Sequence, residues 1–160
     1  MSNVINIEKA AENLKRLRER HKEFMLELRK HHGQEENPVG SLRFDDDQLS
    51  IIVLGVSLDI KHRPVVVETM MPELIEYVVF TEHESEHVVV FKFYLHLNSC
   101  LSRNPDSESK LCDYDNHKIE KILVYEVSEQ LLKSPIFRIE NKSKSDPLSE
   151  KKDSAQSEMQ

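Results

Sequence analysis

A chain of 160 residues with 38% hydrophobic and 32% charged residues has room for one folded domain with a core of its own. The net charge of −7 is uneven: residues 1–32 hold eight Lys or Arg against five Glu, a balance of +3, which leaves −10 for the remainder. Because an acidic body repels phosphate backbones, this distribution argues against nucleic acid as the partner and leaves an acidic protein, or a second copy of the chain, as an alternative.

Residues 6–32 are predicted to form one long amphipathic helix. Asn6 has the side chain of an N-cap, Glu8 stands in the first turn, basic residues crowd the last turn, and Gly33 follows as a stop. The apolar stripe has alternating spacings of three and four residues, typical of a helix that pairs with a sheet or with another helix. Its members are Ile7, Ala10, Leu14, Leu17, His21, Phe24 and Leu28.

After a turn-rich connector at 33–40, the apolar period changes to two and predicts a mostly antiparallel sheet over 50–139. Strands are expected at 50–60, 65–70, 75–82, 87–98 and 119–127, with a turn at 61–64 and a charged hairpin tip at 82–86. One or two helical turns at 128–134 and a final edge strand at 135–139 complete the expectation. Short connections favour a meander of about five strands with the helix packed on it.

The last residues, 141–160, carry almost no apolar side chains and are predicted to be a disordered tail. The expected organisation is therefore a single α+β domain over residues 1–140 followed by that tail. The chain has no run of about 20 apolar residues, its first residues lack the pattern of a secretory signal, and two cysteines make no disulfide framework. We accordingly expect a cytoplasmic protein.

The one group with metal-ligand character is His96, Cys100, Cys112 and His117, two close pairs separated by a polar loop. Zinc takes four such ligands in tetrahedral sites, so a zinc site is one hypothesis. The order His-Cys-Cys-His is unusual, and the alternative is that the cysteines are small apolar anchors of a surface loop. The latter interpretation is favoured, and no cofactor is expected if it holds.

Two further groups suggest chemistry less strongly. His83 and His87 alternate with glutamates at the expected hairpin tip and could hold a divalent cation loosely, but the favoured interpretation is a solvated tip whose charges deter edge pairing. The run Asp45–Asp47 could hold Mg²⁺ in a metal-dependent hydrolase or nuclease, but such runs are more often turns. Three scattered glycines exclude phosphate-binding loops, and no G-x-S-x-G elbow is present.

The pattern therefore favours a non-catalytic protein-interaction module, such as an inhibitor, an immunity- or antitoxin-like binder, or an adaptor. Homo-oligomer formation through the helix is part of this hypothesis. The apolar stripe is wide near Met25 and Leu26, which favours sheet packing for the second half of the helix. The partner-binding residues expected on the first half are Ile7, Ala10, Leu14, Leu17 and His21.

Overall fold

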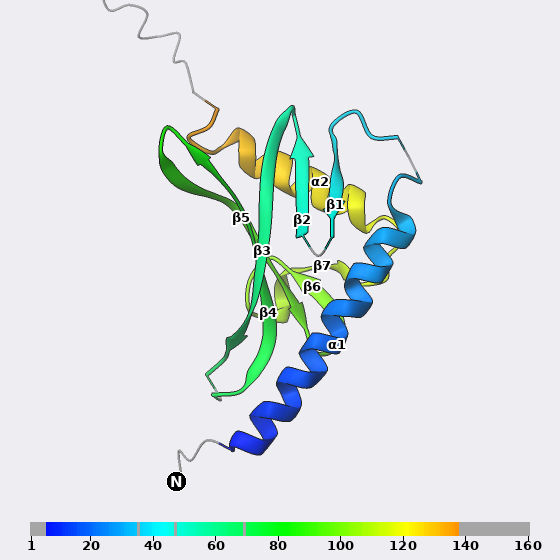
Figure 1. The fold of residues 1–160 in the computed structure, drawn as a ribbon, viewed down its shortest axis with the longest axis vertical. Helices are drawn as coiled ribbons and strands as arrows, with labels where there is room; N and C mark the ends of the chain where they lie inside the picture. Colours follow the sequence, from blue (N-terminus) through cyan, green and yellow to red (C-terminus); the bar gives the residue numbers. More distant parts are fainter. Residues whose placement is uncertain (1–5, 35, 47, 69, 138–160) are drawn as a thin grey trace, which may run out of the picture.

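The structure is a computed structural model that describes residues 6–34, 36–46, 48–68 and 70–137. It is an α+β fold in which the strands form one antiparallel sheet whose spatial order is the chain order, a seven-stranded meander (Figure 1). The elements are α1 (Ile7–His31), β1 (Gly40–Asp45), β2 (Gln48–Val53), β3 (Val56–Val66), β4 (Pro72–His83), β5 (Glu86–His96), β6 (Cys100–Ser102), η1 (Ser107–Ser109), β7 (Lys110–Asp113) and α2 (Ile119–Leu132). The tail predicted at 141–160 lies outside the described residues.

Helix α1 confirms the predicted N-terminal helix and its end signals. The Asn6 side chain accepts a hydrogen bond from the Lys9 backbone amide at 2.9 Å, which satisfies one of the free amides of the first turn. At the other end His32 is the C-cap and Gly33 has φ +76°, a conformation in which a β-carbon would be strained. The apolar rhythm and the caps together were sufficient to locate this helix.

The single strand expected at 50–60 is wrong, because the segment is a hairpin. Leu54 and Gly55 both have positive φ, 51° and 79°, which is the geometry of a tight two-residue turn between β2 and β3. The inward positions change from odd to even across this turn. They are Leu49, Ile51 and Val53 in β2, then Leu58 and Ile60 in β3. Because apolar residues occupy both faces near the turn, the alternation gave no sign of the reversal.

The turn expected at 61–64 is also wrong. Strand β3 continues through these residues to Val66, and its pairing with β4 covers them. Pairing with β2 ends at the Leu49–Ile60 pair, so the later part of β3 is an open sheet edge. Pro64 lies in this stretch. Proline has no amide proton to donate, and it is tolerated at an open edge because no further strand needs that hydrogen bond. The strand expected at 65–70 is therefore only the end of β3 followed by a turn.

Strands β4 and β5 confirm the expected strands 75–82 and 87–98 and the hairpin between them. The tip is at Glu84 and Ser85, both with positive φ. A register shift between Val79 and Phe80 adds a bulge. Three strands were missed: β1, and the short β6 and β7, which fold back from a segment expected to be a polar loop. The sheet thus has seven strands, not about five.

The strand expected at 119–127 is wrong, because these residues form the first part of α2. Ile119, Leu123, Val127 and Leu131 are buried at every fourth position, a helical period that the β-branched content of the segment concealed. The helical turns predicted at 128–134 are the second half of this helix. In the described part of the range 135–139, residues 135–137 form turns and no strand.

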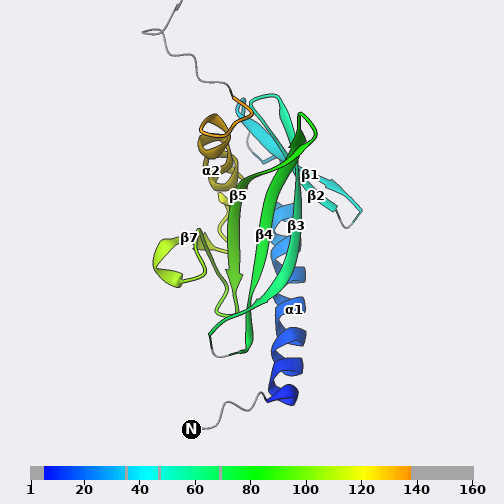
Figure 2. The ribbon, with the colours of Figure 1, turned by 90° about the vertical axis from the view of Figure 1, so that its left-hand side faces the viewer.

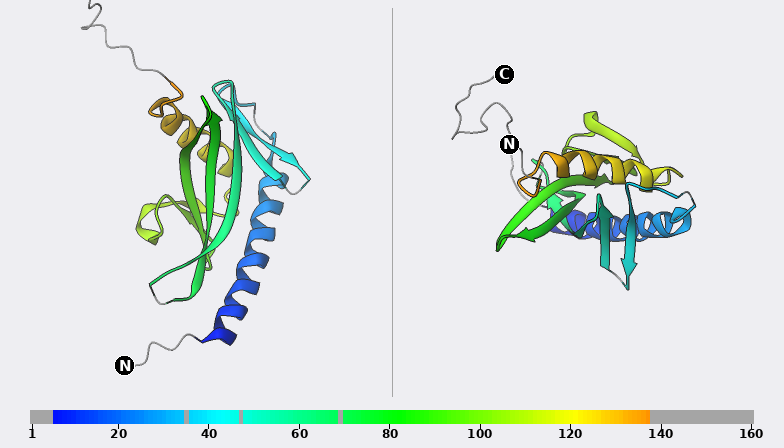
Figure 3. Two further views of the ribbon diagram at one scale, coloured as in Figure 1. Left: turned by 60° about the vertical axis from the view of Figure 1, so that its left-hand side comes forward. Right: turned by 90° about the horizontal axis from the view of Figure 1, so that it is seen from above.

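Both helices contribute to one core. Phe24 of α1 meets the ring of Tyr77 edge-on at 5.3 Å, and Tyr77 stacks on Phe93 at 4.8 Å, so aromatic rings join α1 to β4 and β5. The fully buried helix residues are Leu17, Phe24 and Leu28 in α1, and Ile119, Leu123, Val124, Val127 and Leu131 in α2. Figure 3 shows α1 beside the β3–β4 part of the sheet and the β1–β2 hairpin projecting from it. Neither of the two described helices has the length and apolar character needed to cross a membrane.

Candidate functional site

The five residues predicted to bind a partner are divided by the fold. Leu17 is buried in the core, with 1% of its surface exposed, and Ala10 and Leu14 are half-buried. Ile7, in the first turn, is 69% exposed. His21 is half-buried against the sheet. The face of α1 that carries the apolar stripe therefore packs on the chain itself from about Asn13, which is 4% exposed, and is open only toward its beginning.

The beginning of α1 lies at the same end of the molecule as the β3–β4 connection (Figures 1 and 3). Two further exposed apolar side chains lie here, Val66 at the end of β3 at 58% and Met70 in the connection at 52%. We call Ile7, Val66 and Met70 the open apolar end. Single exposed apolar residues are ordinary on a protein surface, but here three lie at one end of the fold.

A histidine–tyrosine cluster lies between α1 and the sheet. The Nδ1 atom of His21 is 2.7 Å from the hydroxyl oxygen of Tyr77. The imidazole of His62, on the open edge of β3, stacks on that of His21 with ring centroids 4.0 Å apart. α1 and β3 are thus joined by two rings that come from positions 41 residues apart.

The surroundings hold both imidazoles neutral at pH 7. Burial, and secondarily the nearby His62, lowers the pKa of His21 to about 4. Burial also lowers the pKa of His62 and raises the pKa of Tyr77 well above its usual value. A neutral imidazole and a protonated phenol form an ordinary hydrogen bond, and the tautomer of His21 decides which group donates. The arrangement fixes α1 to the sheet and resists protonation.

A cavity of about 400 Å³ opens beside this cluster. Besides the three rings it is lined by Met25 of α1 and by Gln48, Asp59 and Phe80 of the sheet. In the sequence, the apolar stripe of α1 points to His21 but gives no sign of His62 and Tyr77. His62 was assigned to a turn, and no local pattern connects either residue with α1.

A second cluster lies on the face of β3–β5 opposite α1 and is centred on Glu76, whose side chain is 9% exposed. Its carboxylate accepts hydrogen bonds from the Arg63 Nε at 3.2 Å and from the Tyr94 hydroxyl at 3.1 Å. The Lys92 Nζ is 3.8 Å away. A buried carboxylate is well compensated here, because two cations and a hydroxyl surround it. The sequence gives no sign of this cluster either, since its residues are brought together only by strand register.

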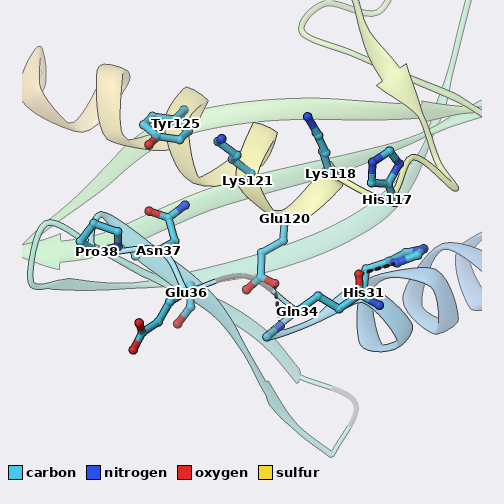
Figure 4. Close-up of a pocket in the computed structure, with 13 residues that line it drawn as sticks. His31, Gln34, Glu36, Asn37, Pro38, His117, Lys118, Glu120, Lys121 and Tyr125 are labelled. Carbon is cyan, nitrogen blue, oxygen red and sulfur yellow. Dashed lines mark hydrogen bonds between the residues drawn. The ribbon is translucent and has the colours of Figure 1, made fainter.

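A third group lies where the start of α2 meets the end of α1 (Figure 4). The carboxylate of Glu120 points from α2 toward the chain that follows α1 and accepts hydrogen bonds from two backbone amides, Leu42 at 2.8 Å and Gly33 at 3.3 Å. One of its oxygens is also 3.0 Å from the His32 Nδ1. The adjacent cavity measures about 160 Å³. Glu120 therefore ties α2 to β1 and to the end of α1, a structural role.

The four residues of the zinc hypothesis lie on four different segments. His96 ends β5 and lies 2.7 Å from the Ser102 hydroxyl, whereas His117 lines the cavity beside Glu120. Cys100 faces Asp113 across the β6–β7 pair and Cys112 faces Leu101, so the two cysteines are on opposite faces of that pair. Across residues 6–137, apart from the gaps at 35, 47 and 69, no three His, Cys, Asp or Glu side chains gather in a way that could hold a metal. The zinc site stays a prediction that this geometry does not support.

The two weaker candidates are surface features. At the β4–β5 tip His83 pairs with Glu84 at 3.5 Å and His87 with Glu82 at 3.4 Å. Asp45 ends β1 and Asp46 occupies the following turn with φ 56°, where its carbonyl oxygen accepts a hydrogen bond from Arg29. Asp47 lies outside the described residues. Among the described residues of these groups, His83, His87 and Asp45 lie at or near strand ends, and Asp46 lies in a turn.

No protein-family model, curated protein or solved structure matches this chain. The function is therefore inferred from the arrangement of the chain's own side chains.

Proposed function

We propose that this chain is a non-catalytic protein-interaction module that binds another protein, or a second copy of itself, through the first half of α1 and the adjoining sheet surface. The observation that carries the proposal is the contrast along one helix face. Ile7 is 69% exposed, whereas Leu17, Phe24 and Leu28 are at most 1% exposed. The stripe that the fold uses for its own core extends beyond the part that the fold covers.

The energetics of the open apolar end favour a partner. Covering an isoleucine side chain is worth roughly 1.5–3 kcal/mol, and Val66 and Met70 at the same end add to the apolar area. A few well-covered apolar side chains commonly supply most of the affinity of an interface. The open apolar end is therefore well suited to be the centre of a protein–protein interface.

The charge pattern favours an acidic counterpart. The first half of α1 carries exposed basic side chains, Lys9, Lys15, Arg16 and Arg18, around the apolar stripe. The residues outside 1–32 carry a net charge of −10. An acidic surface of a second copy therefore complements the basic first half of α1 as well as an acidic partner does. Such charges mainly speed association and select orientation.

The test compares Ile7→Asp with Leu26→Asp. Leu26 is a matched control because it is on the same helix, is 65% exposed, and lies on the outer side. Each tagged protein is used to capture partners from the source cell, and each purified protein is measured by size-exclusion chromatography with light scattering. We expect Ile7→Asp to lose a specific partner, or the dimer mass, while Leu26→Asp retains it. Equal binding by all three proteins, or a monomer that captures nothing, would contradict the proposal.

A further inference from the structure

The face of the sheet opposite α1 carries a concentration of positive charge that is unusual for an acidic protein. Lys61 and Arg63 on β3 and Lys92 on β5 stand on either side of Glu76 on β4, because the register pairs Lys61 and Lys92 with Val78 and Arg63 with Glu76. Side chains paired across antiparallel strands share a face, so these groups form one surface. Figure 2 views this part of the sheet with α1 behind it.

The charges do not cancel. Glu76 is the only carboxylate among the residues that line this part of the described surface, and it is already engaged by Arg63 and Lys92. Lys61 lies over the ring of Phe80 at 4.7 Å and forms no ion pair in the described part of the chain. Three cations against one carboxylate leave an excess of two positive charges, and the side chain of Arg63 is 74% exposed.

These side chains surround a depression of about 310 Å³ on the sheet surface. Val78 and Val89 supply apolar lining, and His87 lies at one margin. The depression is thus an open hollow whose lining is partly apolar and partly cationic. We call it the cationic depression.

The surroundings limit the length of an anionic ligand. Beyond His87 the β4–β5 tip carries Glu82, Glu84 and Glu86, and Asp59 precedes Lys61 on β3. These carboxylates repel a long polyanion that crosses the whole face, whereas a short one fits over the three cations. Inorganic anions are small and make few contacts in so open a hollow, which gives little to offset the cost of association.

We propose that the cationic depression binds a short acidic peptide segment of a partner protein, with two or more Asp or Glu carboxylates over Lys61, Arg63 and Lys92. This inference concerns a surface on the outer side of β3–β5, which meets the cavity beside α1 at Lys61 and His62, and it goes beyond the interaction proposed for the first half of α1. Arg63 supplies guanidinium N–H donors beyond the one on Glu76, and the two lysines flank it as point charges.

The probe is a fluorescein-labelled hexaglutamate peptide, titrated with the full chain and followed by fluorescence anisotropy. The test variant is Lys61→Ala with Lys92→Ala, and the matched control removes two exposed lysines at the start of α2, the N-cap Lys118→Ala with Lys121→Ala. We expect saturable binding that weakens roughly tenfold in the test variant, since two exposed charge contacts are lost, and less than twofold in the control. Ile7→Asp is expected to bind the peptide normally, which separates this result from the test of α1.

Lys61→Ala alone keeps the measurement decisive if the double variant unfolds, because Lys61 makes no ion pair in the described part of the chain. Equal weakening in the test and control variants would overturn the proposal, as would no binding at all. Displacement of the peptide by an equal concentration of glutarate or inorganic phosphate would assign the depression to small anions instead. Tighter binding of a single-stranded oligonucleotide would assign it to nucleic acid.

Discussion

Acidification should destabilise this protein through His21. In the folded chain its imidazole is stacked against His62, lies 2.7 Å from the Tyr77 hydroxyl, and is half-buried between α1 and the sheet. A proton added there would place a charge next to a second imidazole in a poorly hydrated site. In the unfolded chain the same proton is fully solvated.

The two pKa values set the sign and the range of the effect. The pKa of His21 is about 4 when folded, against 6.5 for a free histidine. Between these values the unfolded chain binds more protons than the folded chain. The contribution of His21 to the free energy of unfolding is therefore fully present above pH 6.5 and decreases as the pH falls toward 4. The full gap corresponds to roughly 3 kcal/mol, and partial exposure of the ring reduces the expected loss to about 1–2 kcal/mol.

Urea unfolding of the wild type and of His21→Gln at pH 7 and pH 5 measures this contribution. His96, whose pKa is also lowered by burial, is unaffected by the substitution, so the difference between the two pH dependences reports His21 together with the part of the His62 shift that depends on the stacked His21 ring. We expect the wild type to lose about 1 kcal/mol more than the variant between these two pH values, when partial exposure is allowed for. Identical pH dependences would refute the burial of a neutral His21 between α1 and β3.

Two further changes test the packing that positions the helices. Glu120→Ala removes the acceptor of two backbone amides and should lower the free energy of unfolding by about 2 kcal/mol, whereas Glu129→Ala, on an exposed part of the same helix, should change it by less than ~0.5 kcal/mol. Equal effects of the two in thermal unfolding would argue against the anchoring role. Phe24→Ala removes the aromatic contact between α1 and the sheet and should lower the free energy of unfolding by about 3–5 kcal/mol, whereas Leu26→Ala should change it by less than ~0.5 kcal/mol. A small loss for Phe24→Ala in urea titration would mean that α1 is not docked as described.

The parts of the fold that were predicted correctly are those with redundant local signals. For α1 the N-cap Asn6, the basic last turn, Gly33 and the apolar rhythm all agree, so the helix could be placed to within a residue. The β4–β5 hairpin has long alternating strands and a polar tip, and it was also located. The meander itself followed from the short connections.

The errors come from segments where both secondary structures satisfy the local pattern. In Ile119–Val127 the β-branched residues favour a strand, but burial at every fourth position requires a helix, and contacts of α2 with β5 and β1 decide between them. At Leu54 a bulky residue with positive φ opens the turn, where Gly or Asn would have been a recognisable signal.

The candidate sites depended on long-range pairing and were largely invisible beforehand. His21 was noticed because an imidazole interrupts an apolar stripe, yet its partners Tyr77 and His62 are identified only by the packing of α1 on the sheet. The charges around Glu76 gather only through the register of β3, β4 and β5. Ile7 was predicted as a binding residue from the stripe, and its exposure agrees with that prediction without testing it.

Hydrogen–deuterium exchange read by mass spectrometry tests the role of α1 most directly. The chain is compared alone and with the captured partner, or at low and high concentration if light scattering reveals a second copy. Binding through the first half of α1 predicts slower exchange in residues 7–17 and at the β3–β4 connection. Unchanged exchange in both segments, with slowing confined to α2 or to β6–β7, would contradict it.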